Sequence, residues 1–122
     1  MRVVVADSNP MVREMLAACC ELIEGVQAVH VALDDVDAIY QVMSTGAGVV
    51  VVDVDHPVLD GLWLIRSLRR AGCTARIIST SSAANDHLAG QAAQAGSTVH
   101  LVKPFPLEEF FRAVLSGPVR LR

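Results

Sequence analysis

Polar side chains that could do chemistry follow four of the five apolar runs in this chain. They are the carboxylates of Asp7 and Asp53, the hydroxyls of Ser8 and Ser81, and the ammonium of Lys103. Short apolar runs rich in Val and Ile are typical of strands buried on both faces. In an open parallel sheet the carboxyl ends of the strands share one edge, where ligands collect. The sequence therefore predicts a functional edge that carries acids, hydroxyls and one cation.

The stretch at residues 49–61, VVVVDVDHPVLDG, is the centre of this arrangement. Its four valines are expected to form a buried strand that ends at Asp53. Asp55 follows two residues later, and Pro57 and Gly61 favour a stiff loop. The sequence contains no evident nucleophile–base pair and no cofactor-binding loop, which disfavours an enzyme that turns over a small substrate.

The rest of the chain supplies the elements that must position these side chains. Strands are predicted at residues 2–6, 27–33, 49–53, 75–80 and 98–102, and helices at 10–23, 36–43, 62–71, 85–95 and 107–115. Pro10 suits a first helical turn, and glycines end several helices. Because strand and helix alternate five times, the sequence predicts a parallel sheet with right-handed crossovers.

The helical spacing also predicts which side chains pack on the sheet. In the second helix Val36, Ile39, Tyr40 and Met43 recur at helical intervals and are expected to face inward. Arg69, like the other arginines of the third helix, is expected to point into solvent.

Composition limits the class of protein. The 122 residues suit one domain, 1–122, in which residues 117–122 could be the stub of a linker. A net charge of −3 argues against binding a nucleic acid backbone. The three cysteines form no CxxC pair, which suits a reducing, cytoplasmic setting. No signal peptide or membrane-spanning run is expected.

Four segments together resemble the receiver domain of bacterial two-component response regulators. They are VVVADSNPMVRE, VVDVDHPVLDG, RIISTSS and VHLVKPF. The D-x-x-x-P-x-x-D-G loop combined with K-P-F is more specific than either motif alone, and the resemblance spans residues 2–115. It implies a flavodoxin-like, doubly wound α/β fold with five parallel strands in the order 2-1-3-4-5 and five helices.

The resemblance implies a role for each residue at the edge. Asp53 matches the phosphoacceptor, which takes a phosphoryl group from a histidine kinase or phosphotransfer protein. Lys103 matches the lysine that stabilises the moving charge, and Ser81 the hydroxyl that turns to the new phosphoryl oxygens. Asp7, Asp53 and Asp55 are the expected surroundings of a magnesium ion, because hard oxygen ligands suit that metal.

Two residues depart from the family pattern. Ser8 stands where the family usually has a second acid that binds the metal directly, so we expect weak magnesium binding. His100 stands where the family often has an aromatic switch residue, and an imidazole there could change charge near neutral pH. The Lys103–Pro104 bond is expected to be cis, as in the family.

Two functions from different classes follow from these observations. The first is a phosphoacceptor receiver domain, which is not an enzyme beyond accepting its own phosphoryl group. The alternative is a pseudo-receiver, an interaction module that phosphate does not switch. Ser8 favours the pseudo-receiver, whereas Asp53, Ser81 and Lys103 favour the phosphoacceptor. An output domain, a partner protein or a second copy is expected on the fourth helix, fifth strand and fifth helix, with an apolar, weakly salt-dependent contact and no membrane.

Each residue also has a plainer interpretation. Asp53 could cap a turn, and Lys103 could be a solvated surface lysine. Ser81 could be loop filler, and Asp7 could serve the dipole of the following helix. His100 could be structural, packed on an alternating strand. If the side chains lie together at one edge of the sheet, the functional roles are favoured. If they lie apart, the plainer structural roles are favoured.

Overall fold

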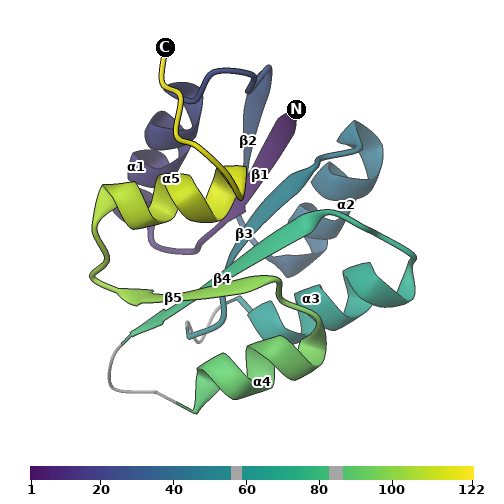
Figure 1. Ribbon diagram of the computed structural model, residues 1–122. Coiled ribbons are helices and arrows are strands. Elements are labelled where there is room, and N and C mark those ends of the chain that lie inside the picture. The colour runs from purple at the N-terminus through teal and green to yellow at the C-terminus, as the bar shows by residue number, and fades with distance from the viewer. Residues whose placement is uncertain (56–58, 83–86) are drawn as a thin grey trace.

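A computed structural model describes residues 1–55, 59–82 and 87–122 and shows one parallel sheet between two layers of helices (Figure 1). The strands are β1 (Arg2–Ala6), β2 (Ala28–Ala32), β3 (Val49–Asp53), β4 (Arg76–Ser82) and β5 (Val99–Lys103). They lie in the order β2-β1-β3-β4-β5, and every neighbouring pair is parallel. The predicted fold class and strand order are confirmed.

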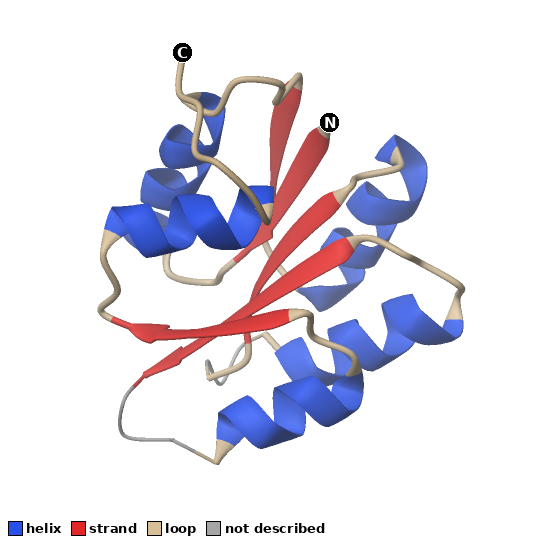
Figure 2. Cartoon of the chain, in the orientation of Figure 1, coloured by secondary structure: helices blue, strands red, loops and turns tan. Residues whose placement is uncertain are grey.

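Helices cover both faces of the sheet (Figure 2). They are α1 (Pro10–Glu21), α2 (Asp35–Thr45), α3 (Gly61–Arg70), α4 (Leu88–Ala95) and α5 (Leu107–Leu115). On one face α1 and α5 pack around Leu16 and Phe110, and on the other α2, α3 and α4 pack around Leu64 and Leu68. The predicted start of the fourth helix, at residue 85, lies outside the described residues. Among the described helices, none combines the length and apolarity needed to cross a membrane.

The predicted inward face of α2 is wrong for three of its four residues, whereas Ile39 packs against the core as predicted. Val36, Tyr40 and Met43 are 66%, 70% and 52% exposed, whereas Ala38 and Val42 are buried on the sheet. The helix is apolar on both sides, so spacing alone could not choose between them. The small side chains of Ala38 and Val42 let the helix backbone lie close to the strands.

The predicted solvent position of Arg69 is also wrong. Its guanidinium donates to the carbonyl oxygens of Gly96, at 2.9 Å, of Cys73, at 2.9 Å, and of Ala75, at 2.8 Å. These carbonyls belong to the loops that follow α3 and α4. Arg69 therefore satisfies the carbonyl of the residue that ends α4 and two carbonyls of the loop between α3 and β4.

The carboxyl ends of β3, β4 and β5 set the positions of the candidate site. Asp53 pairs in register with Thr80, and Ser82 pairs with Lys103. β4 runs two residues beyond its predicted end because Ser81 and Ser82 pair with β5. The sheet thus carries a continuous row of polar residues along one edge.

Candidate functional site

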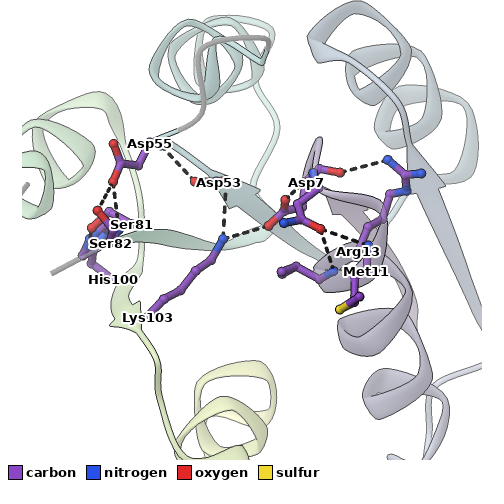
Figure 3. A network of polar contacts seen from close by, with 11 residues as sticks. Asp7, Met11, Arg13, Asp53, Asp55, Ser81, Ser82, His100 and Lys103 are labelled. Carbon is purple, nitrogen blue, oxygen red and sulfur yellow. Dashed lines mark hydrogen bonds and ion pairs between the residues drawn. The ribbon is translucent and has the colours of Figure 1, made fainter. Parts of the chain in front are cut away.

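Lys103 joins the two buried acids of the strand edge. Asp7 and Asp53 are only 1% and 5% exposed; Asp7 directly follows β1, and Asp53 is the last residue of β3. The Lys103 Nζ lies 3.0 Å from Asp7 Oδ2 and 3.4 Å from Asp53 Oδ2 (Figure 3). The Lys103–Pro104 bond is cis, as predicted. The structure therefore brings together three of the predicted site residues as a charge-assisted network.

The backbone holds the other oxygen of each acid. Asp7 Oδ1 accepts the N–H of Asn9, and Asp53 Oδ1 accepts the N–H of Asp55, both at 2.9 Å. A carboxylate that accepts an N–H two residues ahead stabilises a tight turn directly after its strand. Asn9 then caps α1 through the N–H groups of Met11 and Val12. Strand end, turn and helix start thus fix the Asp7 carboxylate in place.

Gly61 closes the loop that follows Asp53. Asp60 caps α3 by accepting the N–H of Trp63 at 3.0 Å, and Gly61 is the first helical residue. A Cβ at Gly61 would overlap the carbonyl oxygen of Asp53 and lie 2.9 Å from Val54 Cα. Because glycine alone lacks this atom, the Asp-Gly pair lets α3 begin directly against the Asp53 backbone.

Asp55 is bonded to the end of β4. Its Oδ2 accepts the backbone N–H of Ser82 at 2.9 Å and the Ser82 hydroxyl at 2.6 Å. This contact was not predicted, although the run of hydroxyls at residues 79–82 was a signal that β4 had further donors at the edge. The role of Asp55 toward magnesium stays a prediction.

Ser81 and His100 form a bonded pair. Ser81 is 1% exposed, and its Oγ lies 2.7 Å from His100 Nε2. Figure 3 shows this pair beside Asp55 on one side of Asp53, with Asp7 on the other side. Burial lowers the pKa of the His100 imidazole, so the neutral ring is favoured at neutral pH. The pair predicted to act as a switch is in contact.

The oxygen atoms at this edge of the sheet are suitable ligands for a magnesium ion. Asp7 and Asp53 carry two negative charges against the one positive charge of Lys103, so negative charge remains. Ser8 Oγ is shielded from solvent and has no hydrogen-bond partner among the described residues, which leaves a free oxygen beside Asp7. Hard oxygens of this kind suit magnesium. Among residues 1–55, 59–82 and 87–122, no three His, Cys, Asp or Glu side chains gather as a metal-binding group, so the fit depends on two acids and neutral oxygens.

Thr80 is a buried hydroxyl at the edge that the sequence reasoning missed. It is fully buried and pairs in register with Asp53. Its Oγ1 has no hydrogen-bond partner within the described part of the chain. A buried hydroxyl without a hydrogen-bond partner costs free energy. Because Thr80 is next to Asp53, its hydroxyl is placed to form a hydrogen bond with an oxygen atom of a ligand at that site. Its place directly before Ser81 in RIISTSS was the available signal.

Comparison with known proteins agrees with this geometry. The sequence matches the response regulator receiver domain family over residues 3–115. A protein-glutamate methylesterase/protein-glutamine glutaminase of Myxococcus xanthus is 34% identical over 108 residues, which cover 88% of this chain and 31% of that protein. The response regulator MprA of Mycobacterium avium is 34% identical over 111 residues, which cover 89% of this chain and 47% of that protein. The chain thus spans less than half the length of these two relatives.

Solved structures show the same fold. A LuxR-family two-component response regulator from Aurantimonas superposes with a TM-score of 0.84 at 26% identity, covering 94% of this chain and 82% of that chain. The receiver domain of the Francisella response regulator 1452 superposes with a TM-score of 0.80 at 26% identity, covering 93% and 92%. The family match, the relatives and the strand-edge acids agree, and this chain belongs to the response regulator receiver domain family.

Proposed function

We propose that Asp53 of this receiver domain accepts a phosphoryl group from a histidine kinase or a phosphotransfer protein. The observation that carries the proposal is the Lys103 ammonium, which contacts the carboxylates of both Asp7 and Asp53 at the carboxyl edge of the sheet. An isolated turn-capping acid needs no such cation. None of the relatives and structures named above favours a pseudo-receiver.

The chemistry follows from the contacts of Asp53. Its carboxylate attacks phosphorus, so an O–P bond forms and the P–N bond of the donor phosphohistidine breaks. Negative charge then collects on the phosphoryl oxygens, and the Lys103 ammonium is close enough to Asp53 to stabilise it. The Ser81 hydroxyl, on the neighbouring strand, donates to a phosphoryl oxygen once it leaves His100.

Asp7 and Asp53 would hold magnesium, with Ser8 and the backbone carbonyl of Asp55 as neutral oxygens. When bound, the ion neutralises charge on the carboxylates and the phosphoryl oxygens. With a hydroxyl at position 8, the site has one formal negative charge less than the family's usual pair of acids. We therefore expect weak magnesium binding and slow, measurable phosphorylation.

Intact-mass measurement after incubation with acetyl phosphate and magnesium tests this function. We expect the mass of one phosphoryl group on the wild-type chain and none on Asp53→Asn, which should retain the wild-type unfolding transition. Asp35→Asn, at the start of α2 and away from the strand edge, is the matched control and should still be modified. A wild-type chain that gains no mass would refute the proposal and leave the pseudo-receiver as the better description.

The output of the domain is proposed to pass through α4, β5 and α5. Val102 and Leu107 are exposed on this face, at 42% and 48%. Glu108 and Arg112 pair within α5 at 2.6 Å, so these charges are already matched inside one helix. A partner protein, an output domain or a second copy would therefore meet a mainly apolar surface in the cytoplasm. The domain itself acts as acceptor and signal carrier rather than as an enzyme.

A further inference from the structure

A chain of short hydrogen bonds leads away from Ser81 along β4 and β5. Ser81 Oγ lies 2.7 Å from His100 Nε2, and His100 Nδ1 lies 2.7 Å from Ser79 Oγ. Ser79 Oγ lies 2.7 Å from Ser97 Oγ, which lies 2.9 Å from the carbonyl oxygen of Val99. Ser79 and His100 pair in register, so the strand alignment brings the members together.

The number of protons sets the direction of this chain. There are four short contacts, and the three serines and one neutral imidazole supply four protons. The Val99 carbonyl can only accept, so Ser97 donates to Val99. Ser79 must then donate to Ser97, the imidazole must donate to Ser79 from Nδ1, and Ser81 must donate to Nε2.

Two longer contacts point the same way. Ser79 Oγ lies 3.3 Å from the Val99 carbonyl, and Ser97 Oγ lies 3.4 Å from the carbonyl of Ile77. Both carbonyls are acceptors, so this end of the chain takes protons from the serines. The far end of the chain therefore determines which ring nitrogen of His100 carries its proton.

We infer that Ser79 and Ser97 are positioning residues of the phosphorylation site, because they hold His100 as the Nδ1–H tautomer and so commit the Ser81 hydroxyl proton to His100. This inference rests on the proposed function of Asp53. The two serines touch neither Asp53 nor Lys103 in any hydrogen bond of the described residues. They act on the site through His100 and Ser81.

Phosphorylation requires the opposite direction of donation. To donate to a phosphoryl oxygen, Ser81 must withdraw its proton from Nε2. The imidazole then favours the Nε2–H tautomer, which donates to Ser81 Oγ, and Ser79 turns its hydroxyl toward Nδ1. Every group keeps one proton, since Nδ1 releases a proton to water and Nε2 takes one from water. Ser79 then no longer donates to Ser97, and Ser97 has one proton for both Ser79 and the Val99 carbonyl. One short hydrogen bond is therefore lost, so the series of hydrogen bonds favours the unphosphorylated arrangement.

Long-range 1H–15N correlation spectra of the 15N-labelled full chain test the tautomer. His100→Gln identifies the His100 signal among the four histidines. We expect a protonated Nδ1 in the wild type and a shift toward protonated Nε2 in Ser79→Ala. A smaller shift is expected in Ser97→Ala, where Ser79 can still donate to the Val99 carbonyl over the longer contact of 3.3 Å. Ser79→Thr keeps the hydroxyl, so His100 should keep its proton on Nδ1 as in the wild type. Ser44→Ala, on the exposed end of α2, is the control and should not change it.

Phosphorylation rates with acetyl phosphate provide the second measurement. Ser79→Ala should be phosphorylated about fivefold faster than the wild type, the effect of one net hydrogen bond that no longer has to break. In a Ser81→Ala background the same change should have no effect. A structural role alone would alter stability without this dependence on Ser81.

Three results would overturn the inference. They are a protonated Nε2 in the wild type, an unchanged tautomer in folded Ser97→Ala, and a shifted tautomer with no change in phosphorylation rate. Ser97 is partly exposed, so its variant keeps the test decisive if Ser79→Ala does not fold. A wild-type chain that takes no phosphoryl group would refute the function of Asp53, while the spectra would still decide the tautomer independently.

Discussion

The Lys103 ammonium lies 3.0 Å from the Asp7 carboxylate, although 96 positions separate the two residues in the sequence. The contact links the last residue of β5 to the turn after β1 and passes over the end of β3, where Asp53 lies. Lys103 therefore neutralises the same carboxylates that would hold a metal. A cation that enters this edge must share them with the lysine.

Replacing Lys103 with Met should separate metal binding from phosphoryl transfer. Without the ammonium, Asp7 and Asp53 should bind magnesium about tenfold more tightly. Phosphorylation by acetyl phosphate should nevertheless slow about a hundredfold, because one preorganised donor to the developing charge is lost. Calorimetric titration with magnesium measures the affinity, and the increase in intact mass over time measures the phosphorylation rate.

Arg13→Met is the matched control for that experiment. Arg13 is also a cation near Asp7, but it donates to the Asp7 backbone carbonyl at 3.1 Å rather than to the carboxylate. We expect a much smaller change in both measurements. Weaker magnesium binding in Lys103→Met would contradict the competition between lysine and metal.

Replacing Ser8 with Asp should restore the acid that the family pattern lacks here. The added carboxylate follows Asp7 directly, and we expect about tenfold tighter magnesium binding, since ligand charge strongly sets affinity for hard cations. Phosphorylation should become faster in the same variant. Ser8→Asn introduces a side chain of the same size as aspartate but without its charge. This variant should gain neither magnesium affinity nor phosphorylation rate. Equal gains in both variants would mean that shape rather than charge limits the site.

Replacing Gly61 with Ala should destabilise the domain by at least about 2 kcal/mol, because the new methyl group overlaps the Asp53 carbonyl. Gly90→Ala is the matched control. Gly90 lies inside α4 with no atom within 4 Å of an added Cβ, so the same change there should stabilise the helix by about 0.5–1 kcal/mol. Urea unfolding of both variants measures these values, and a neutral Gly61→Ala would show that α3 can move away from Asp53.

Much of the fold was predictable because its signals are local. The four valines before Asp53 mark a buried strand, and Pro10 and Gly46 lie where a helix begins and ends. The edge location of Asp7, Asp53 and Lys103 also followed from the sequence, since parallel strands end on one side. In contrast, the exposed position of Tyr40 was not predictable, because α2 is apolar on two sides and periodicity does not rank them.

The finer contacts of the site depend on strand register, which the sequence pattern does not specify. Asp55 bonds Ser82, and His100 bonds Ser79, only because β4 continues to Ser82 and aligns with β5 in one register. A shift of one residue would send these side chains to the opposite face of the sheet. The row of hydroxyls was visible in the sequence, but its partners were not.

The lowered pKa of His100 predicts how stability depends on pH. In the unfolded chain this imidazole titrates near its usual value of about 6.5, whereas burial lowers its pKa in the folded domain. Below pH about 6.5 the unfolded state therefore binds more protons at this residue than the folded state. By linkage, the free energy of unfolding falls as pH decreases through that window, and His100 has no such effect at higher pH, where it is neutral in both states.

Urea unfolding of the wild type and of His100→Gln between pH 8 and pH 5 isolates this effect. Glutamine cannot titrate, and the other three histidines and all the acids are common to both chains. The two stabilities should therefore differ by a constant above pH about 7 and should converge or cross below pH about 6.5, because only the wild type loses the His100 contribution. A difference that stays constant over the whole range would show that His100 titrates alike in both states. A wild type that gains stability relative to His100→Gln on acidification would mean that the folded site favours imidazolium, in which Nε2 donates to Ser81 and the Ser81 hydroxyl proton is not committed to His100.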